Sequence, residues 1–279
     1  MISINTNYGG LYASQAARNS QTLMDTAMER LSTGKRINYA SDDAAGQGIA
    51  TRLSGEIQGL AMAAKNAADA QSMLDTTEGA LQEVHSLLLR MRELSVQGSN
   101  DTYTTADRAA MQSEVKSLEA EIQRVSDNTT WGGQKLLDGT FSTTAAIFQI
   151  GVDNGETMTI TLPSIDATTT FANGGLGLDG SVTTQAAATA YITKIDNAIS
   201  HVSSDRGFLG ANSNRLDSTI TNLNQIKVNL TASKGRIEDA DFAAETSNLA
   251  KSQILQQAAT AMLAQANASK TNILTLVRG

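Results

Sequence analysis

The chain contains no cysteine, a single proline and few aromatic residues, which make up 4% of its 279 positions. Without cysteine there are no disulfides, thiolate nucleophiles or cysteine-based zinc sites. A proline inside a helix costs about 3 kcal/mol, so its near-absence favours long uninterrupted helices. The scarcity of aromatic side chains favours slender helices packed through Ala and Leu over a thick globular core.

Sequence features typical of nucleic-acid-binding, membrane and secretory proteins are also missing. The net charge is −7 and no basic run stands out, so a nucleic-acid partner is not expected. The longest apolar runs, such as Leu60 to Ala64, are far shorter than the ~20 residues that cross a bilayer, so membrane insertion is not expected. The first basic residue is Arg18, and we expect no cleaved secretory signal peptide.

The strongest pattern is a narrow apolar stripe that begins at Ile49 and continues to Met91. Its members are spaced three and four residues apart, and Gln71 and Glu78 interrupt it. This spacing predicts one long helix with coiled-coil-like packing over about 44–97. Ser41, followed by two aspartates, is the expected N-terminal cap.

A second helix is expected after a short turn at 98–101. Thr104 and Asp107 resemble a capping box, with Asp in place of the usual Glu or Gln. Apolar residues from Met111 to Val125 then repeat every three or four positions. Because the connection is short, the two helices should lie antiparallel.

The only clear β pattern lies in the middle of the chain. Alternating apolar residues flank Asn154-Gly155, which predicts a hairpin at about 146–162 that ends before Pro163. The Thr- and Gly-rich segment 164–182 lacks periodicity and is expected to be an exposed loop.

Helical periodicity returns after residue 183 and is interrupted near Arg206-Gly207. Residues 252–269 carry no charge but contain several amides among many alanines. Such a helix suits close packing against many identical neighbours, although an ordinary buried helix explains it equally well. The expected fold is mainly α: a long antiparallel helical bundle or coiled coil built from both chain ends, with a small β-hairpin region in the middle.

Several segments resemble bacterial flagellin in sequence and in order. They are SINTN at the start, ERLSTGKRINYASDDAAGQGIATRL at 29–53, RMRELSVQ at 90–97, RIEDADF at 236–242 and QILQQAATAMLAQAN at 253–267. The resemblance covers about 1–140 and 200–279 and implies a subunit that polymerises into the flagellar filament for swimming. It also implies a short member without large outer domains.

The family's organisation assigns a role to each segment. Residues 1–40 and 240–279 would form the inner coiled coil, and 41–163 and 183–239 the rod domain. The segment 164–182 would replace the outer domains. The resemblance further implies partners: other copies of the chain, hook-associated and cap proteins, an export chaperone at the C-terminal segment and the flagellar secretion apparatus. It places the protein in the extracellular filament.

Catalysis is poorly supported by the sequence, and no cofactor or metal is expected. His85 and His201 lie in helical patterns without a neighbouring ligand set. The acidic pair Asp42 and Asp43 is better explained as helix-start residues than as a cation site. Asn-X-Ser/Thr triplets are expected to be accidental in a chain that bypasses the secretory route.

The resemblance carries over one binding site and one kind of modification. Arg90, Leu94 and Glu114 match the family's recognition site for an innate Toll-like receptor. Alternatively, Arg90 is a subunit contact or a solvated charge, and Leu94 a packing residue. Candidate O-glycosylation acceptors are Thr168, Thr169, Thr170, Ser181 and Thr183.

Three other classes of protein compete with the filament subunit. A hook–filament junction protein shares the terminal helices, but the segments at 236–242 and 253–267 favour the filament protein. An enzyme would need an insertion large enough to fold alone. A coiled-coil adaptor explains the apolar stripes but not the uncharged segment 252–269.

Overall fold

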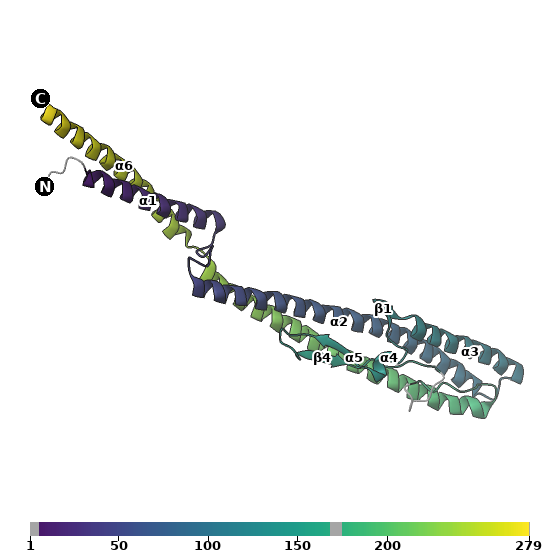
Figure 1. Ribbon diagram of the computed structural model, residues 1–279. Helices are drawn as coiled ribbons and strands as arrows, with labels where there is room; N and C mark the ends of the chain where they lie inside the picture. Colours follow the sequence, from purple (N-terminus) through teal and green to yellow (C-terminus); the bar gives the residue numbers. More distant parts are fainter. Residues whose placement is uncertain (1–5, 168–174, 279) are drawn as a thin grey trace. The chain divides into compact units, whose positions relative to one another are not determined.

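The computed structural model describes residues 6–167 and 175–278, without the side chains of 272–278, and is predominantly helical (Figure 1). The helices are α1 (Tyr8–Thr33), α2 (Ala44–Gly98), α3 (Thr105–Asn128), α4 (Thr140–Thr143), α5 (Gln185–Glu238) and α6 (Phe242–Arg278). The strands are β1 (Thr130–Trp131), β2 (Gln134–Lys135), β3 (Ala146–Gln149) and β4 (Thr157–Ile160). The chain divides into two compact units: the terminal unit, residues 1–55 and 229–279, and the central unit, residues 56–228.

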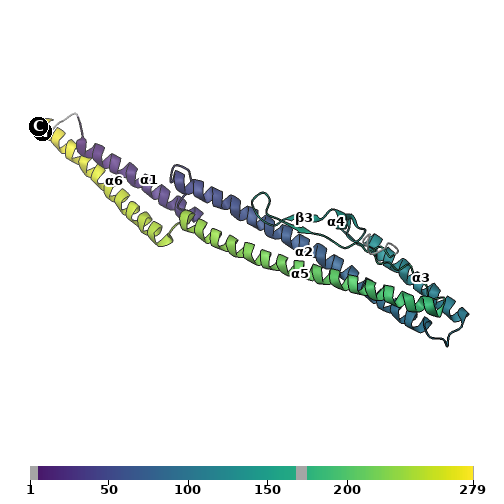
Figure 2. The same ribbon diagram turned by 90° about the horizontal axis from the view of Figure 1, so that it is seen from below.

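In the central unit, α2, α3 and α5 lie side by side (Figures 1 and 2). The predicted stripe of α2 forms the middle of a continuous core, and Leu74, Leu81 and Leu88 are almost completely buried. Polar contacts align α2 with α5 in antiparallel register. Gln71 donates to Asp217 at 3.0 Å, and Arg92 lies 2.6 Å from Asp196.

The start of α3 confirms the predicted capping box. The Thr104 hydroxyl accepts a hydrogen bond from the Asp107 amide, and the Asp107 carboxylate accepts one from the Thr104 amide. The Thr104 hydroxyl also donates to the Asp107 carboxylate at 2.7 Å, and this hydrogen bond, together with the one from the Thr104 amide, lowers the pKa of Asp107 below its usual range. The prediction that Ser41 caps α2 is wrong. Asp43 is the capping residue, because its carboxylate accepts a hydrogen bond from the Gly46 amide at 2.9 Å.

The predicted hairpin is confirmed, with strands shorter than the apolar alternation suggested. β3 pairs antiparallel with β4, and Gln149 lies opposite Thr157. Residues 150–156 form the connecting loop, in which Gly155 adopts a φ of 92°. A smaller hairpin, β1–β2, turns at Gly132 and Gly133, both with positive φ.

The prediction of an exposed loop at 164–182 is wrong for the described parts of that segment. Ile165, Leu176, Leu178 and Val182 are at most 1% exposed and belong to the core. The segment lacks periodicity because it crosses the surface of the helices without forming a regular element. Its backbone is held by hydrogen bonds to other backbone groups, as from the Leu178 amide to the Ala167 carbonyl at 2.8 Å, and to side chains, as where Gln112 accepts a hydrogen bond from the Val182 amide.

The predicted interruption of the return helix near Arg206-Gly207 is also wrong, because α5 is continuous across it. A glycine costs only about 1 kcal/mol in a helix interior. Burial of Leu209 and Leu216, and a 2.7 Å contact between Arg206 and Glu78, offset that cost.

In the terminal unit, α1 and α6 form an antiparallel pair (Figure 1). Arg30 pairs with Glu245 at 2.9 Å, and Gln256 donates to Gln21 at 2.5 Å. The buried contact positions repeat every seven residues and are mostly small: Ala13, Ser20 and Ala27 on α1, and Glu245, Ser252 and Ala259 on α6. Small side chains let the two helices approach closely but bury little apolar area.

The two segments that join these helices to α2 and α5 are bonded to each other. Gly34 ends α1 with a φ of 72°, a left-handed cap that favours glycine. The Arg36 amide donates to the Glu238 carbonyl at 2.7 Å, and the Ala240 amide donates to the Gly34 carbonyl at 3.0 Å. Glu238 also pairs with Lys35, and this hydrogen bond lowers its pKa.

Candidate assembly surfaces and recognition patch

The terminal unit exposes most of its large apolar side chains. Tyr12 is 85% exposed, and Ile254 and Met262 are each 65% exposed. Other exposed apolar residues of α1 and α6 are Tyr8, Leu11, Leu23, Met28, Phe242 and Leu255. Contiguous exposed apolar surface on a monomer marks an interaction site. Two isolated helices with this composition need further copies or partners to bury it.

A groove runs along one side of the α1/α6 pair, and we refer to it as the α1/α6 groove. It consists of a polar part of about 270 Å³ and an apolar part of about 610 Å³, which share Leu23 and Leu255. The apolar part has walls of Tyr12, Leu23, Leu255 and Met262, and none of the residues that line it is charged.

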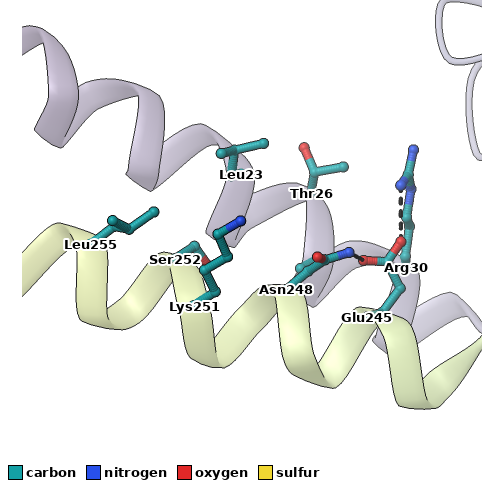
Figure 3. Close-up of a pocket in the computed structure, with 9 residues that line it drawn as sticks. Leu23, Thr26, Arg30, Glu245, Asn248, Lys251, Ser252 and Leu255 are labelled. Carbon is teal, nitrogen blue, oxygen red and sulfur yellow. Dashed lines mark hydrogen bonds and ion pairs between the residues drawn. The ribbon is translucent and has the colours of Figure 1, made fainter.

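The polar part of the groove ends at a charge pair (Figure 3). The Glu245 carboxylate on α6 accepts two hydrogen bonds, one from Arg30 on α1 and one from Asn248 on α6 itself. Burial alone raises the pKa of Glu245, but these two hydrogen bonds bring it below the usual value. The carboxylate therefore stays ionised and fixes one end of the helix pair.

Two of the three predicted receptor residues lie together on the central unit. The Arg90 guanidinium donates to Glu114 from Nε and Nη2, at 3.0 and 2.8 Å, and to Glu93 at 3.0 Å. Hydrogen bonds to Glu114 raise the pKa of Arg90 further. Leu94 does not join this surface, because its side chain is only 2% exposed and packs in the core.

The other predicted positions give a mixed result. Thr183 is exposed and Ser181 half-buried, with their hydroxyl oxygens 2.9 Å apart, whereas Thr168, Thr169 and Thr170 lie outside the described residues. His201 lies 3.0 Å from Asp205 on the same helix. Burial raises the pKa of Asp205.

No group of three His, Cys, Asp or Glu side chains suited to a metal ion occurs within 6–167 and 175–271. In the part of the chain that the structure describes, no helix is long and apolar enough to cross a bilayer.

These features define a class of protein: a helical structural subunit whose terminal helices present apolar surface for association. Comparison with known proteins identifies the class further. Residues 4–142 match the family profile of the bacterial flagellin N-terminal helical region, and residues 192–277 match the profile of the C-terminal helical region.

Curated relatives match over nearly the whole chain. A flagellin of Halalkalibacterium halodurans is 43% identical over 252 residues, covering 90% of this chain and 91% of the relative. A flagellin of Bacillus subtilis is 38% identical over 307 residues, covering 99% of both. The chain therefore belongs to the bacterial flagellin family. It is a short member and a structural subunit of the flagellar filament.

Solved structures agree with this assignment. Bacillus cereus flagellin has a TM-score of 0.50 and 30% identity, covering 57% of this chain and 88% of that protein. A putative flagellar hook-associated protein from Vibrio parahaemolyticus has a TM-score of 0.61 but only 21% identity, covering 71% and 100%. The second similarity shows a shared fold alone, so the hook-associated alternative gains no support from it.

Proposed function

We propose that α1 and α6 make the main contacts between copies in the filament, and that the protein acts as a building block without catalysing a reaction. The observation that carries this proposal is the exposure of nine large apolar side chains on only two helices. In the central unit, by contrast, a continuous core buries the helix stripes. The terminal unit therefore offers the apolar surface for contacts between copies, and we expect the central unit to stay folded without such contacts.

This difference also supports folding coupled to assembly. Isolated helix pairs with small contact residues are marginal in water, because packing supplies most helix stability. We expect the segments 1–40 and 240–279 to order fully only when neighbouring copies bury them. Such a chain stays compatible with export through the flagellar secretion apparatus, without a cleaved signal peptide, until it reaches the growing tip. There it would meet the hook-associated and cap proteins.

Electron microscopy of the purified chain, seeded with filament fragments, tests the assembly role. Limited proteolysis of the monomer should remove both terminal segments quickly and leave a stable core within about 45–235 that no longer extends the seeds. Termini that resist protease equally in monomer and filament would disprove the coupling of folding to assembly. An export chaperone for the C-terminal segment should protect 240–279 from the same protease.

The Arg90–Glu114 pair supports a second proposal, recognition of the monomer by a Toll-like receptor. The pair is exposed, charged and held in one geometry by two hydrogen bonds. Leu94 would act from the core by fixing the helix that carries Arg90. Charge reversal of Arg90 or Glu114 should weaken receptor activation while helical content is retained. The matched control is Arg124→Glu, which removes a similar exposed ion pair on α3. Unchanged activation by the Arg90/Glu114 double reversal would exclude this patch.

Modification of the polar segment after Gly180 is a third proposal. Ser181 and Thr183 are the candidate O-glycosylation acceptors with described positions, and the Thr183 side chain is exposed. Mass spectrometry of peptides from native filaments tests this proposal. If all peptides that span Ser181 and Thr183 are unmodified, neither residue is an O-glycosylation site.

A further inference from the structure

Two exposed surfaces of the terminal unit lie on opposite sides of the helix pair. On α6, the groove residues Leu255 and Met262 follow buried Ser252 and Ala259 by three positions. Phe242 instead precedes buried Glu245 by three positions and is 56% exposed. A step of three residues turns an α-helix by about 300°, so +3 and −3 displacements point to opposite flanks of the buried face.

A second exposed apolar side chain lies on the same flank as Phe242. The Gln21–Gln256 hydrogen bond joins the two helices on the flank away from the groove. Met28 follows Gln21 by two helical turns, which places it on that flank, and it is 47% exposed. Phe242 and Met28 are therefore exposed apolar side chains that project from one flank of the pair, whereas the α1/α6 groove lies on the other flank.

The uncharged groove favours an uncharged occupant, and the ridges that begin at Leu11 and at Phe242 differ in this respect. Leu11 is followed at seven-residue intervals by Arg18 and Asp25, so this ridge would press charges against uncharged walls, at a high desolvation cost. Phe242 is followed at the same intervals by Leu249 and Gln256, neither of which is charged. Ala16 and Ala258 also line the apolar part of the groove, and their small side chains leave room for an aromatic ring.

We propose that Phe242 of one copy inserts into the α1/α6 groove of a second copy, between Tyr12, Leu23, Leu255 and Met262. Because Phe242 and the groove lie on different surfaces of the same subunit, each copy can use both at once. Such a heterologous contact extends without closing on a pair, as a filament requires. Aromatic anchors in apolar pockets dominate many interfaces. This inference rests on the proposed role of α1 and α6 in assembly and names the contact.

Phe242→Ala is the first test, with Phe208→Ala as the matched control. Phe208 is also an exposed phenylalanine, 47% accessible, but lies in the central unit. The critical concentration for growth on filament seeds should rise at least about tenfold for Phe242→Ala, equivalent to about 1.4 kcal/mol, and change less than about twofold for the control. An equal loss in both variants, or none in Phe242→Ala, overturns the proposal.

Covalent trapping is the second test and uses the absence of native cysteine. Thr246→Cys lies one turn after Phe242, and Ala16→Cys lies in the groove of the same chain. Oxidised filaments of the double variant should give a ladder of covalent multimers, whereas each single variant should not extend beyond dimers. If the double variant forms filaments of normal length but no ladder, the groove contact is refuted while the assembly role of α1 and α6 stands. Failure of the unmodified chain to extend seeds would instead refute the assembly role.

Discussion

Replacing Tyr191 by Phe removes one hydroxyl group from the core of the central unit. Tyr191 is 1% exposed, and its hydroxyl donates to a carboxylate oxygen of Glu119 at 2.9 Å. Glu119 is itself only 7% exposed, and its other oxygen lies 2.5 Å from the Lys116 ammonium. The substitution leaves a buried carboxylate with one partner fewer, while the packing of the ring is kept.

The size of the effect follows from the kind of bond that is lost. A hydrogen bond to a charged group contributes about 1.5–3 kcal/mol to the free energy of unfolding. For a unit of this size, each kcal/mol lowers Tm by about 2–4 °C. We therefore expect Tyr191→Phe to lower the Tm of the central unit by about 3–12 °C.

Urea and thermal unfolding followed by tryptophan fluorescence measure this loss. Trp131 is the only tryptophan and packs against the core of the central unit, so its emission reports that unit. Tyr103→Phe is the control, because the Tyr103 hydroxyl makes an exposed hydrogen bond with Gln97. A loss below about 0.5 kcal/mol in Tyr191→Phe, no larger than an ordinary surface change, would refute the importance of the Tyr191–Glu119 bond.

The same bond has a defined pH dependence. Burial, followed by the charge of Glu119, raises the pKa of Tyr191 well above its usual value of 10. The folded state therefore keeps the phenol protonated where the unfolded state begins to ionise. The difference in stability between the wild type and Tyr191→Phe should be constant from neutral pH to about pH 10 and shrink above it.

Three further predictions concern assembly, pH and packing. Ala259 is buried against α1 and Ala264 is exposed in the subunit; we expect Ala259→Glu to weaken the helix pair itself and Ala264→Glu to shorten filaments only, and normal filament length in both variants would argue against burial of α6. The depressed pKa of Glu238 means that its contribution to stability is present above the ordinary value of 4.5 and is lost as pH falls through the folded value; the hydrogen-exchange protection factors of the connecting segments, which are corrected for the intrinsic exchange rate at each pH, should therefore fall with acid, and Glu238→Gln should flatten that dependence, whereas an unchanged slope would exclude Glu238 as its source. A Cβ at position 180 would overlap the ring of Tyr191, so Gly180→Ala should cost about 1–3 kcal/mol in tryptophan-monitored urea unfolding, and an unchanged midpoint would contradict that packing.

Periodicity predicted the helices well because their cores repeat regularly. The stripe from Ile49 to Met91 gave α2 almost to its ends, and Thr104 with Asp107 gave the start of α3. Even the two interruptions of the stripe have a structural cause. Gln71 and Glu78 face polar partners on α5 instead of apolar ones.

Where tertiary contacts replace local regularity, the sequence was a poorer guide. Nothing periodic marks Ile165, Leu176 or Leu178, because each is placed by the surface that it covers. Gly207 suggested a break that the packing of α5 overrides. The site residues show the same division. The resemblance to flagellins selected Arg90 and Glu114, whereas the burial of Leu94 and the opposed positions of Phe242 and the groove depend on helix faces in three dimensions.

The paired connecting segments at Gly34–Arg36 and Glu238–Ala240 have a mechanical consequence. A single extended segment swivels about its own bonds and absorbs a twist. Here backbone hydrogen bonds at 2.7 and 3.0 Å join the two segments, so a twist of one segment about its own axis also strains the other. A bacterial flagellum works by transmitting torque along its length. We expect two connecting segments joined by hydrogen bonds to resist twisting of the terminal unit more than a single segment would.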